Sequence, residues 1–146
     1  MRLKIETSVK QDYKSVWNGF DETLFLKLSP PFPPVKLIRF DGSIKGDRVI
    51  LELNFFLFKQ EWESEITDNG ELENEIYFID EGIRLPFFLK SWKHKHRIIK
   101  SGEGSIISDE IEFTAPIPGM ELALYPTMWQ QFNYRKPIYQ SFFDIK

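Results

Sequence analysis

The residues of this chain best suited to chemistry are its only two histidines, His94 and His96, which lie two positions apart. They fall in a stretch, 92–98, in which aromatic, imidazole and aliphatic residues alternate with lysine and arginine. A period of two is typical of a β-strand with two different faces. Because the cations belong on the solvent side, both imidazoles should lie on the covered side. There they could serve as hydrogen-bond anchors, acid–base groups or metal ligands, since imidazole titrates near neutral pH.

A second strand should lie beside the histidines. Segment 105–115 follows the turn-forming residues Ser101-Gly102-Glu103-Gly104, so it is expected to return as an antiparallel partner of the histidine strand. Facing residues on one side of such a pair have Cβ atoms roughly 5 Å apart. The facing pairs on the covered side are then Trp92 and Phe113, His94 and Ile111, His96 and Asp109, and Ile98 and Ile107. In this register Asp109 can orient the ring of His96 and favour its charged form, while His94 has no evident partner.

Three interpretations of these polar residues remain open. Asp109 can simply satisfy His96 and fix the strand register, because buried polar groups generally have partners. One of the histidines can instead anchor an oxygen of an otherwise apolar ligand in a cavity. Finally, His94, His96 and Asp109 are the candidate catalytic residues for general acid–base chemistry in a dehydration, cyclisation or hydrolysis.

Metal binding is not expected from the sequence. His94, His96 and Asp109 could form a two-histidine, one-carboxylate set. However, the His-x-His-x3–4-Glu run of cupins is absent, because Lys100 stands four residues after His96 and the next glutamate is Glu103. Nothing in the sequence supplies a fourth ligand. No glycine-rich phosphate loop or nucleophile motif is present either, so no cofactor is expected.

Composition narrows the class of protein. The 146 residues are enough for one ordinary domain, 1–146, with a substantial core. The absence of cysteine excludes disulfides and thiolate sites and suits a reducing compartment such as the cytoplasm. A net charge of −3 argues against nucleic-acid binding, and no apolar run suggests a secretion signal or membrane insertion. Fourteen Phe, five Tyr and four Trp indicate either a ring-filled core or a ring-lined cavity.

The strands and helices around the histidines can be predicted from periodicity and turn signals. A first strand at 1–7 is followed by a helix that starts at a Ser8–Gln11 capping box, and by a second short helix capped by Asp21. A proline-rich connector, 30–34, leads into strands separated by turns at 68–70 and 80–82, and a helical tail begins near Met120. The expected strands are 35–40, 48–55, 60–67, 73–79, 89–100 and 105–115. This order predicts an α+β fold in which a curved seven-stranded antiparallel sheet wraps around one long C-terminal helix, which Pro137 should kink or interrupt.

That order, with the residues inside it, resembles the START-like or SRPBCC superfamily, the helix-grip fold of pollen allergens and aromatic polyketide cyclases. The resemblance covers essentially the whole chain and is greatest to small bacterial ligand-binding members. The segments that carry it are Val16-Trp17, Pro30–Pro34, Phe78-Ile79-Asp80-Glu81, Leu85-Pro86-Phe87, Trp92-Lys93-His94-Lys95-His96, 107–113 and Phe132-Asn133-Tyr134-Arg135. The resemblance implies an apolar ligand between the sheet and the long helix. It leaves the reaction, if any, open, because such folds include binders, carriers and enzymes.

The expected partner is therefore a small hydrophobic or amphipathic molecule. The residues expected to line its cavity are Trp62, Phe78, Trp92, His94, His96, Phe113, Met128 and Phe132. Two alternatives remain: a cyclase- or dehydratase-like enzyme that uses the cavity histidines, and an interaction domain with a filled core. The apolar cluster 55–58 could form a lid, a pocket mouth or the contact of a homodimer.

Overall fold

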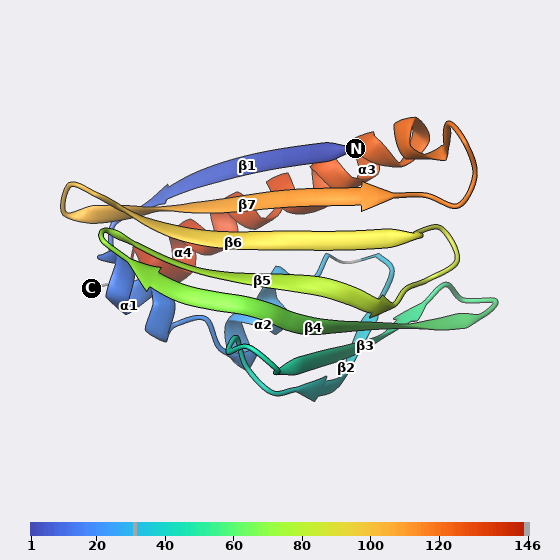
Figure 1. Ribbon diagram of the computed structural model, residues 1–146, viewed down its shortest axis with the longest axis horizontal. Helices are drawn as coiled ribbons and strands as arrows, with labels where there is room; N and C mark the ends of the chain where they lie inside the picture. Colours follow the sequence, from blue (N-terminus) through green and yellow to red (C-terminus); the bar gives the residue numbers. More distant parts are fainter. Residues whose placement is uncertain (31, 145–146) are drawn as a thin grey trace.

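The computed structural model, which describes residues 1–30 and 32–144, has the expected α+β helix-grip architecture (Figure 1). A first strand and two short helices precede six further strands and a C-terminal helical segment. The elements are β1 (Arg2–Val9), α1 (Tyr13–Asn18), α2 (Glu22–Leu28), β2 (Val35–Phe40), β3 (Arg48–Asn54), β4 (Lys59–Leu72), β5 (Glu75–Arg84), β6 (Ser91–Ser101), β7 (Gly104–Thr114), α3 (Met120–Asn133) and α4 (Arg135–Phe143).

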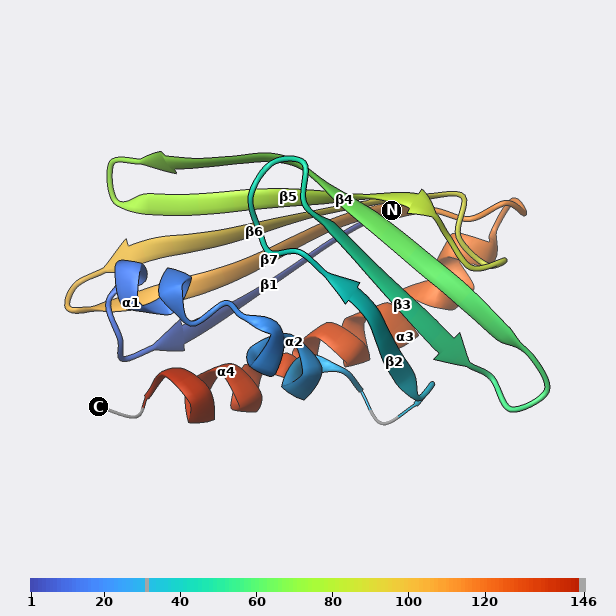
Figure 2. The ribbon, with the colours of Figure 1, turned by 90° about the horizontal axis from the view of Figure 1, so that it is seen from below.

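The seven strands form one antiparallel sheet in the order β1-β7-β6-β5-β4-β3-β2. The sheet is strongly curved, and α2, α3 and α4 lie on its concave side (Figure 2). Part of the curvature comes from β4, whose pairing with β5 shifts register between Glu63 and Ser64 and between Ile66 and Asp68. Such irregularities bend a strand and increase its twist. Beyond this bend, β3 and β2 turn away from the direction of β5, β6 and β7 (Figure 2).

The C-terminal helix is divided at Tyr134 into α3 and α4. Pro137 lies in the first turn of α4, where its missing N–H cannot bond to the carbonyl of Asn133. The expected interruption by Pro137 therefore occurs, three residues before the proline itself. Pro126, the other proline of this helical segment, lies inside α3.

Several local expectations are wrong. Ser8 belongs to β1, so the expected capping box does not exist; α1 is capped instead by Asp12, whose carboxylate accepts from the backbone N–H groups of Lys14 and Ser15. The turns expected at 68–70 and 80–82 are strand, because β4 and β5 run through them and meet in a tight turn between Leu72 and Glu75. The Asp21 cap of α2 is confirmed. Within the proline-rich connector, Pro31 lies outside the described residues, as do 145–146 at the end of the helical tail.

The buried core has two apolar clusters. One joins β1, β6 and β7 to α3 and contains Leu3, Ile5, Leu89, Trp92, Ile111, Phe113, Met128 and Phe132. The other joins the opposite ends of the same strands to α1, α2 and α4 and contains Val9, Val16, Leu24, Leu28, Ile98, Ile107, Tyr139 and Phe143. No helix in the described part of the chain is long and apolar enough to cross a bilayer.

Candidate functional site

A polar layer separates the two apolar clusters. Along β6, Trp92 belongs to the first cluster and Ile98 to the second, and His94 and His96 lie between them. Along β7, Asp109 holds the same intermediate position. The strands pair in the expected register, with His96 opposite Asp109 and His94 opposite Ile111. All three polar residues are buried, so each requires a partner inside the protein.

The partners are not the ones that the register alone suggests. The Oδ1 atom of Asp109 lies 2.8 Å from Nε2 of His94, its diagonal neighbour. Its distance to Nδ1 of the directly facing His96 is longer, 3.5 Å. His94, expected to lack a partner, therefore has a short hydrogen bond. Side chains lean along a strand, and diagonal neighbours are within reach of a ring as long as imidazole.

The partner of His96 is Asp80, which sequence reasoning missed. Its Oδ2 atom lies 2.9 Å from Nε2 of His96, and its Oδ1 atom accepts from the indole N–H of Trp92 at 3.1 Å. Asp80 comes from β5, where it stands opposite His94, two residues after Phe78 opposite His96. The alternation of Ile76, Phe78 and Asp80 on one face was the signal that could have found it, had the Asp-Glu-Gly sequence not suggested a turn.

The electrostatics keep both carboxyl groups ionised. Burial by itself raises the pKa of Asp109, but the hydrogen bond from His94 and the nearby cation of Arg135 lower it to about 2. For Asp80 the opposing effect of burial is again exceeded, chiefly by the hydrogen bond from His96, so its pKa is lowered. Burial, assisted by the adjacent His94, lowers the pKa of His96 to about 4, which makes it neutral at pH 7.

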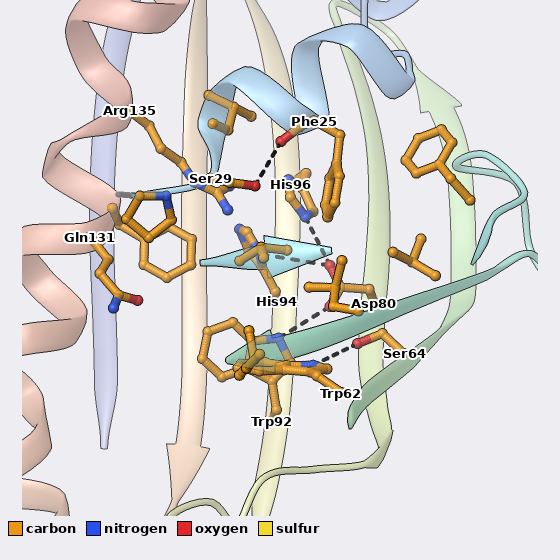
Figure 3. Close-up of a pocket in the computed structure, with 18 of the residues that line it drawn as sticks. Phe25, Ser29, Trp62, Ser64, Asp80, Trp92, His94, His96, Gln131 and Arg135 are labelled. Carbon is orange, nitrogen blue, oxygen red and sulfur yellow. Dashed lines mark hydrogen bonds and ion pairs between the residues drawn. The ribbon is translucent and has the colours of Figure 1, made fainter. Parts of the chain in front are cut away.

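Arg135 brings a positive charge to this layer from α4. Its guanidinium lies over the ring of Phe132, 4.4 Å from the centroid, and 3.9 Å from Oδ1 of Asp109. Figure 3 shows its side chain reaching from the helix toward His94. Phe132 also packs edge-on against His94. The helix thus fixes the guanidinium at the side of the layer that faces the interior space.

A cavity of about 380 Å³ lies between the curved sheet and the helices, next to the polar layer. Its wall is mostly aliphatic and aromatic, from α2, α3 and strands β2 to β6. Trp62 and Trp92 meet edge-on at a centroid separation of 4.8 Å, and the indole N–H of Trp62 donates to Ser64 (Figure 3). The polar side chains on its wall include Asp80, His94, His96, Arg135, Gln131, Ser64 and Thr127.

Seven of the eight expected lining residues border this cavity: Trp62, Phe78, Trp92, His94, His96, Met128 and Phe132. Phe113 does not. Its side chain is 1% exposed and packs in the first apolar cluster, on the part of the sheet that α3 covers directly. In the cluster 55–58, Phe55 borders the cavity, whereas Phe56 and Leu57 project into solvent. Asp109 lies behind the histidines and does not border the cavity.

Solved structures share this fold. No protein-family model matches the sequence, and no curated protein sequence matches it. The Zhui aromatase/cyclase of Streptomyces sp. R1128 superposes with a TM-score of 0.69 at 11% identity, over 95% of this chain and 90% of that one. Norcoclaurine synthase of Thalictrum flavum, solved with dopamine and hydroxybenzaldehyde, gives 0.60 at 12% identity, over 94% and 86%. Major latex-like protein 151 of Panax ginseng gives 0.54 at 15% identity, over 93% and 97%. These matches establish the helix-grip fold that the sequence resembles.

Proposed function

We propose that this protein binds a small hydrophobic or amphipathic molecule in the cavity between the sheet and the C-terminal helices. The observation that carries the proposal is a largely apolar space of about 380 Å³ with ionisable groups on one part of its wall. Cavities of roughly 300–1,000 Å³ with this division of apolar lining and a few polar groups are typical of small-molecule sites. The match to other helix-grip structures over nearly the whole chain also supports our proposal that residues 1–146 form one binding domain.

The arrangement of the wall suggests how such a molecule would lie. Its polar end would meet the carboxylate of Asp80, the neutral imidazole of His96 and the guanidinium of Arg135, which together offer an acceptor and a charged donor. Its apolar body would extend past Trp62 toward Phe55 and the exposed rings beside it. An oxygen-bearing aromatic or aliphatic molecule fits this pattern, since buried donors left without acceptors would cost binding energy. Norcoclaurine synthase, which shares the fold, was solved with two such aromatic molecules, dopamine and hydroxybenzaldehyde.

Filling the cavity should abolish binding. Val49 lies on its wall and faces Ser64 across the β3–β4 pair, so Val49→Trp places an indole in the space that a ligand would use. We expect calorimetric titration with 8-anilinonaphthalene-1-sulfonate, an amphipathic aromatic probe, to show at least a tenfold loss of affinity. The matched control is Ile50→Trp, which adds the same ring to the opposite face of β3.

The control should bind the probe as the unmodified protein does. If Val49→Trp binds equally well, the probe occupies another surface, such as the exposed Phe56 and Leu57, and the cavity proposal fails. Equal losses in both variants would point to unfolding of β3 rather than to blocked space, which a circular dichroism spectrum of each variant separates.

Catalysis of a cyclase or dehydratase type is the second candidate. It is favoured by the Asp80–His96 pair, whose 2.9 Å contact lies on the cavity wall and could move a proton to or from a bound molecule. Asp109, which lies on the side of His94 away from the cavity, would orient the His94 ring through their 2.8 Å hydrogen bond. A bound molecule that is released chemically unchanged supports binding alone. A molecule that is converted by the protein but not by a folded His96→Gln variant supports catalysis.

A further inference from the structure

The two carboxylates of the polar layer face opposite nitrogens of the two imidazoles. Oδ1 of Asp109 lies 2.8 Å from Nε2 of His94 and 3.5 Å from Nδ1 of His96. Oδ2 of Asp80 lies 2.9 Å from Nε2 of His96 and 3.6 Å from Nδ1 of His94. The rings themselves are 3.5 Å apart between centroids. Each ring therefore stands between a carboxylate behind it, Asp109, and one that borders the cavity, Asp80.

The two imidazoles and two carboxylates have more acceptor atoms than protons. An ionised carboxylate only accepts hydrogen bonds, and a neutral imidazole carries one N–H. When both N–H groups point to Asp109, the bare nitrogens of His94 and His96 face the oxygen of Asp80. In the other tautomer of His96, Nε2 donates to Asp80 across the same 2.9 Å contact. In the tautomer that points to Asp109, three acceptors converge with no donor among them, and a cation would complete the arrangement.

Two unpartnered atoms support this arrangement. Among the described residues, Nδ1 of His96 and Oδ2 of Asp109 are buried side-chain atoms without a hydrogen-bond partner. Placing the His96 proton on Nδ1 directs it toward Asp109 and frees Nε2. The charges agree as well. The layer holds two carboxylates, Asp80 and Asp109, and one guanidinium, that of Arg135, which contacts Asp109. With two neutral imidazoles, one negative charge is left to be balanced.

We propose that Asp80, His94 and His96 form a binding site for a divalent transition-metal ion, with Asp109 as the shared support of both imidazoles. One ligand atom from each of the three residues lies within 4.8 Å of the others. Two imidazoles and a carboxylate suit zinc, iron or cobalt, whereas calcium and magnesium prefer oxygen ligands alone. Three protein ligands leave coordination positions open, and they face the cavity, where an oxygen of the proposed organic ligand could occupy one.

Zinc binding to the full chain tests this site without any organic ligand. We expect calorimetry and elemental analysis after dialysis to give one Zn²⁺ per chain. Asp80→Asn should weaken binding at least tenfold, and Asp109→Asn by about 10–100-fold, as is usual when the residue that orients a metal-bound histidine is replaced. The matched control is Glu81→Gln, the same carboxylate-to-amide change one residue along β5, which should bind zinc normally.

A spectroscopic measurement on the unmodified chain covers the case in which a variant does not fold. With Co²⁺ bound, proton NMR should show two strongly shifted exchangeable imidazole signals, one from each of the only two histidines. Absence of these signals, or zinc binding that survives Asp80→Asn in a folded protein, would overturn the metal site. Since neither experiment includes an organic molecule, such a failure would leave the proposed ligand binding intact.

Discussion

Replacing Asp109 with alanine is expected to lower the free energy of unfolding by about 3–5 kcal/mol, because it removes one partner from a buried charged network. The carboxylate is 1% exposed and accepts the 2.8 Å hydrogen bond of His94. Without it, His94 loses its partner and the guanidinium of Arg135 loses its nearest anion. Urea unfolding followed by circular dichroism measures the change.

Two further variants separate the charge network from a general effect of mutating β7. Asp109→Asn keeps an acceptor for His94 and should cost less than the alanine variant. Glu112→Ala removes a carboxylate from the exposed face of the same strand, where its contact with Arg2 is 3.4 Å long and solvated, so its cost should stay below about 1 kcal/mol. A loss of less than 1 kcal/mol for Asp109→Ala would contradict the buried network.

Truncating Phe113 should have a comparable effect on stability and none on ligand binding. The side chain is buried in the cluster that joins β7 to α3, so Phe113→Ala should leave a cavity and cost about 3–5 kcal/mol. Because Phe113 does not border the ligand cavity, the affinity for 8-anilinonaphthalene-1-sulfonate should change less than twofold at a temperature where the variant is folded.

Trp62→Ala is the counterpart of this variant. Trp62 borders the cavity and is partly exposed, so its loss should weaken probe binding more and destabilise the fold less than the loss of Phe113. A Phe113→Ala protein that is stable but binds the probe poorly would mean that Phe113 belongs to the ligand site, as its place in the alternation of β7 first suggested.

The hairpin that carries His94, His96 and Asp109 could be predicted residue by residue. Strict alternation fixes which side chains share a face, and a short glycine-containing turn fixes the register. The hydrogen bonds could not be predicted in the same way. Whether Asp109 bonds to the facing His96 or to the diagonal His94 depends on how each side chain leans, which a register does not determine.

Asp80 was missed because Gly82, two residues later, resembles a turn residue but lies in a strand, as Gly70 does in β4. A side chain at Gly82 would collide with Leu85, and one at Gly70 would lie 3.0 Å from the ring of Tyr77. Both glycines therefore make room for a neighbouring side chain, and both lie within a strand rather than in a turn. Sequence alone does not distinguish this use of glycine from a turn. Because a turn was expected at 80–82, Asp80 was placed outside the predicted strand, although it lies in β5 and its carboxylate contacts His96.

Native mass spectrometry of the purified full chain is the sharpest test of ligand binding in the cavity. A small molecule held in the cavity should appear as a discrete mass above that of the 146-residue chain, and it should be released when the protein is denatured. We expect such a complex, or its formation on adding 8-anilinonaphthalene-1-sulfonate at one molecule per chain, for the unmodified protein and for Ile50→Trp but not for Val49→Trp. The same complex in all three proteins, or no complex in any of them, would contradict ligand binding in the cavity.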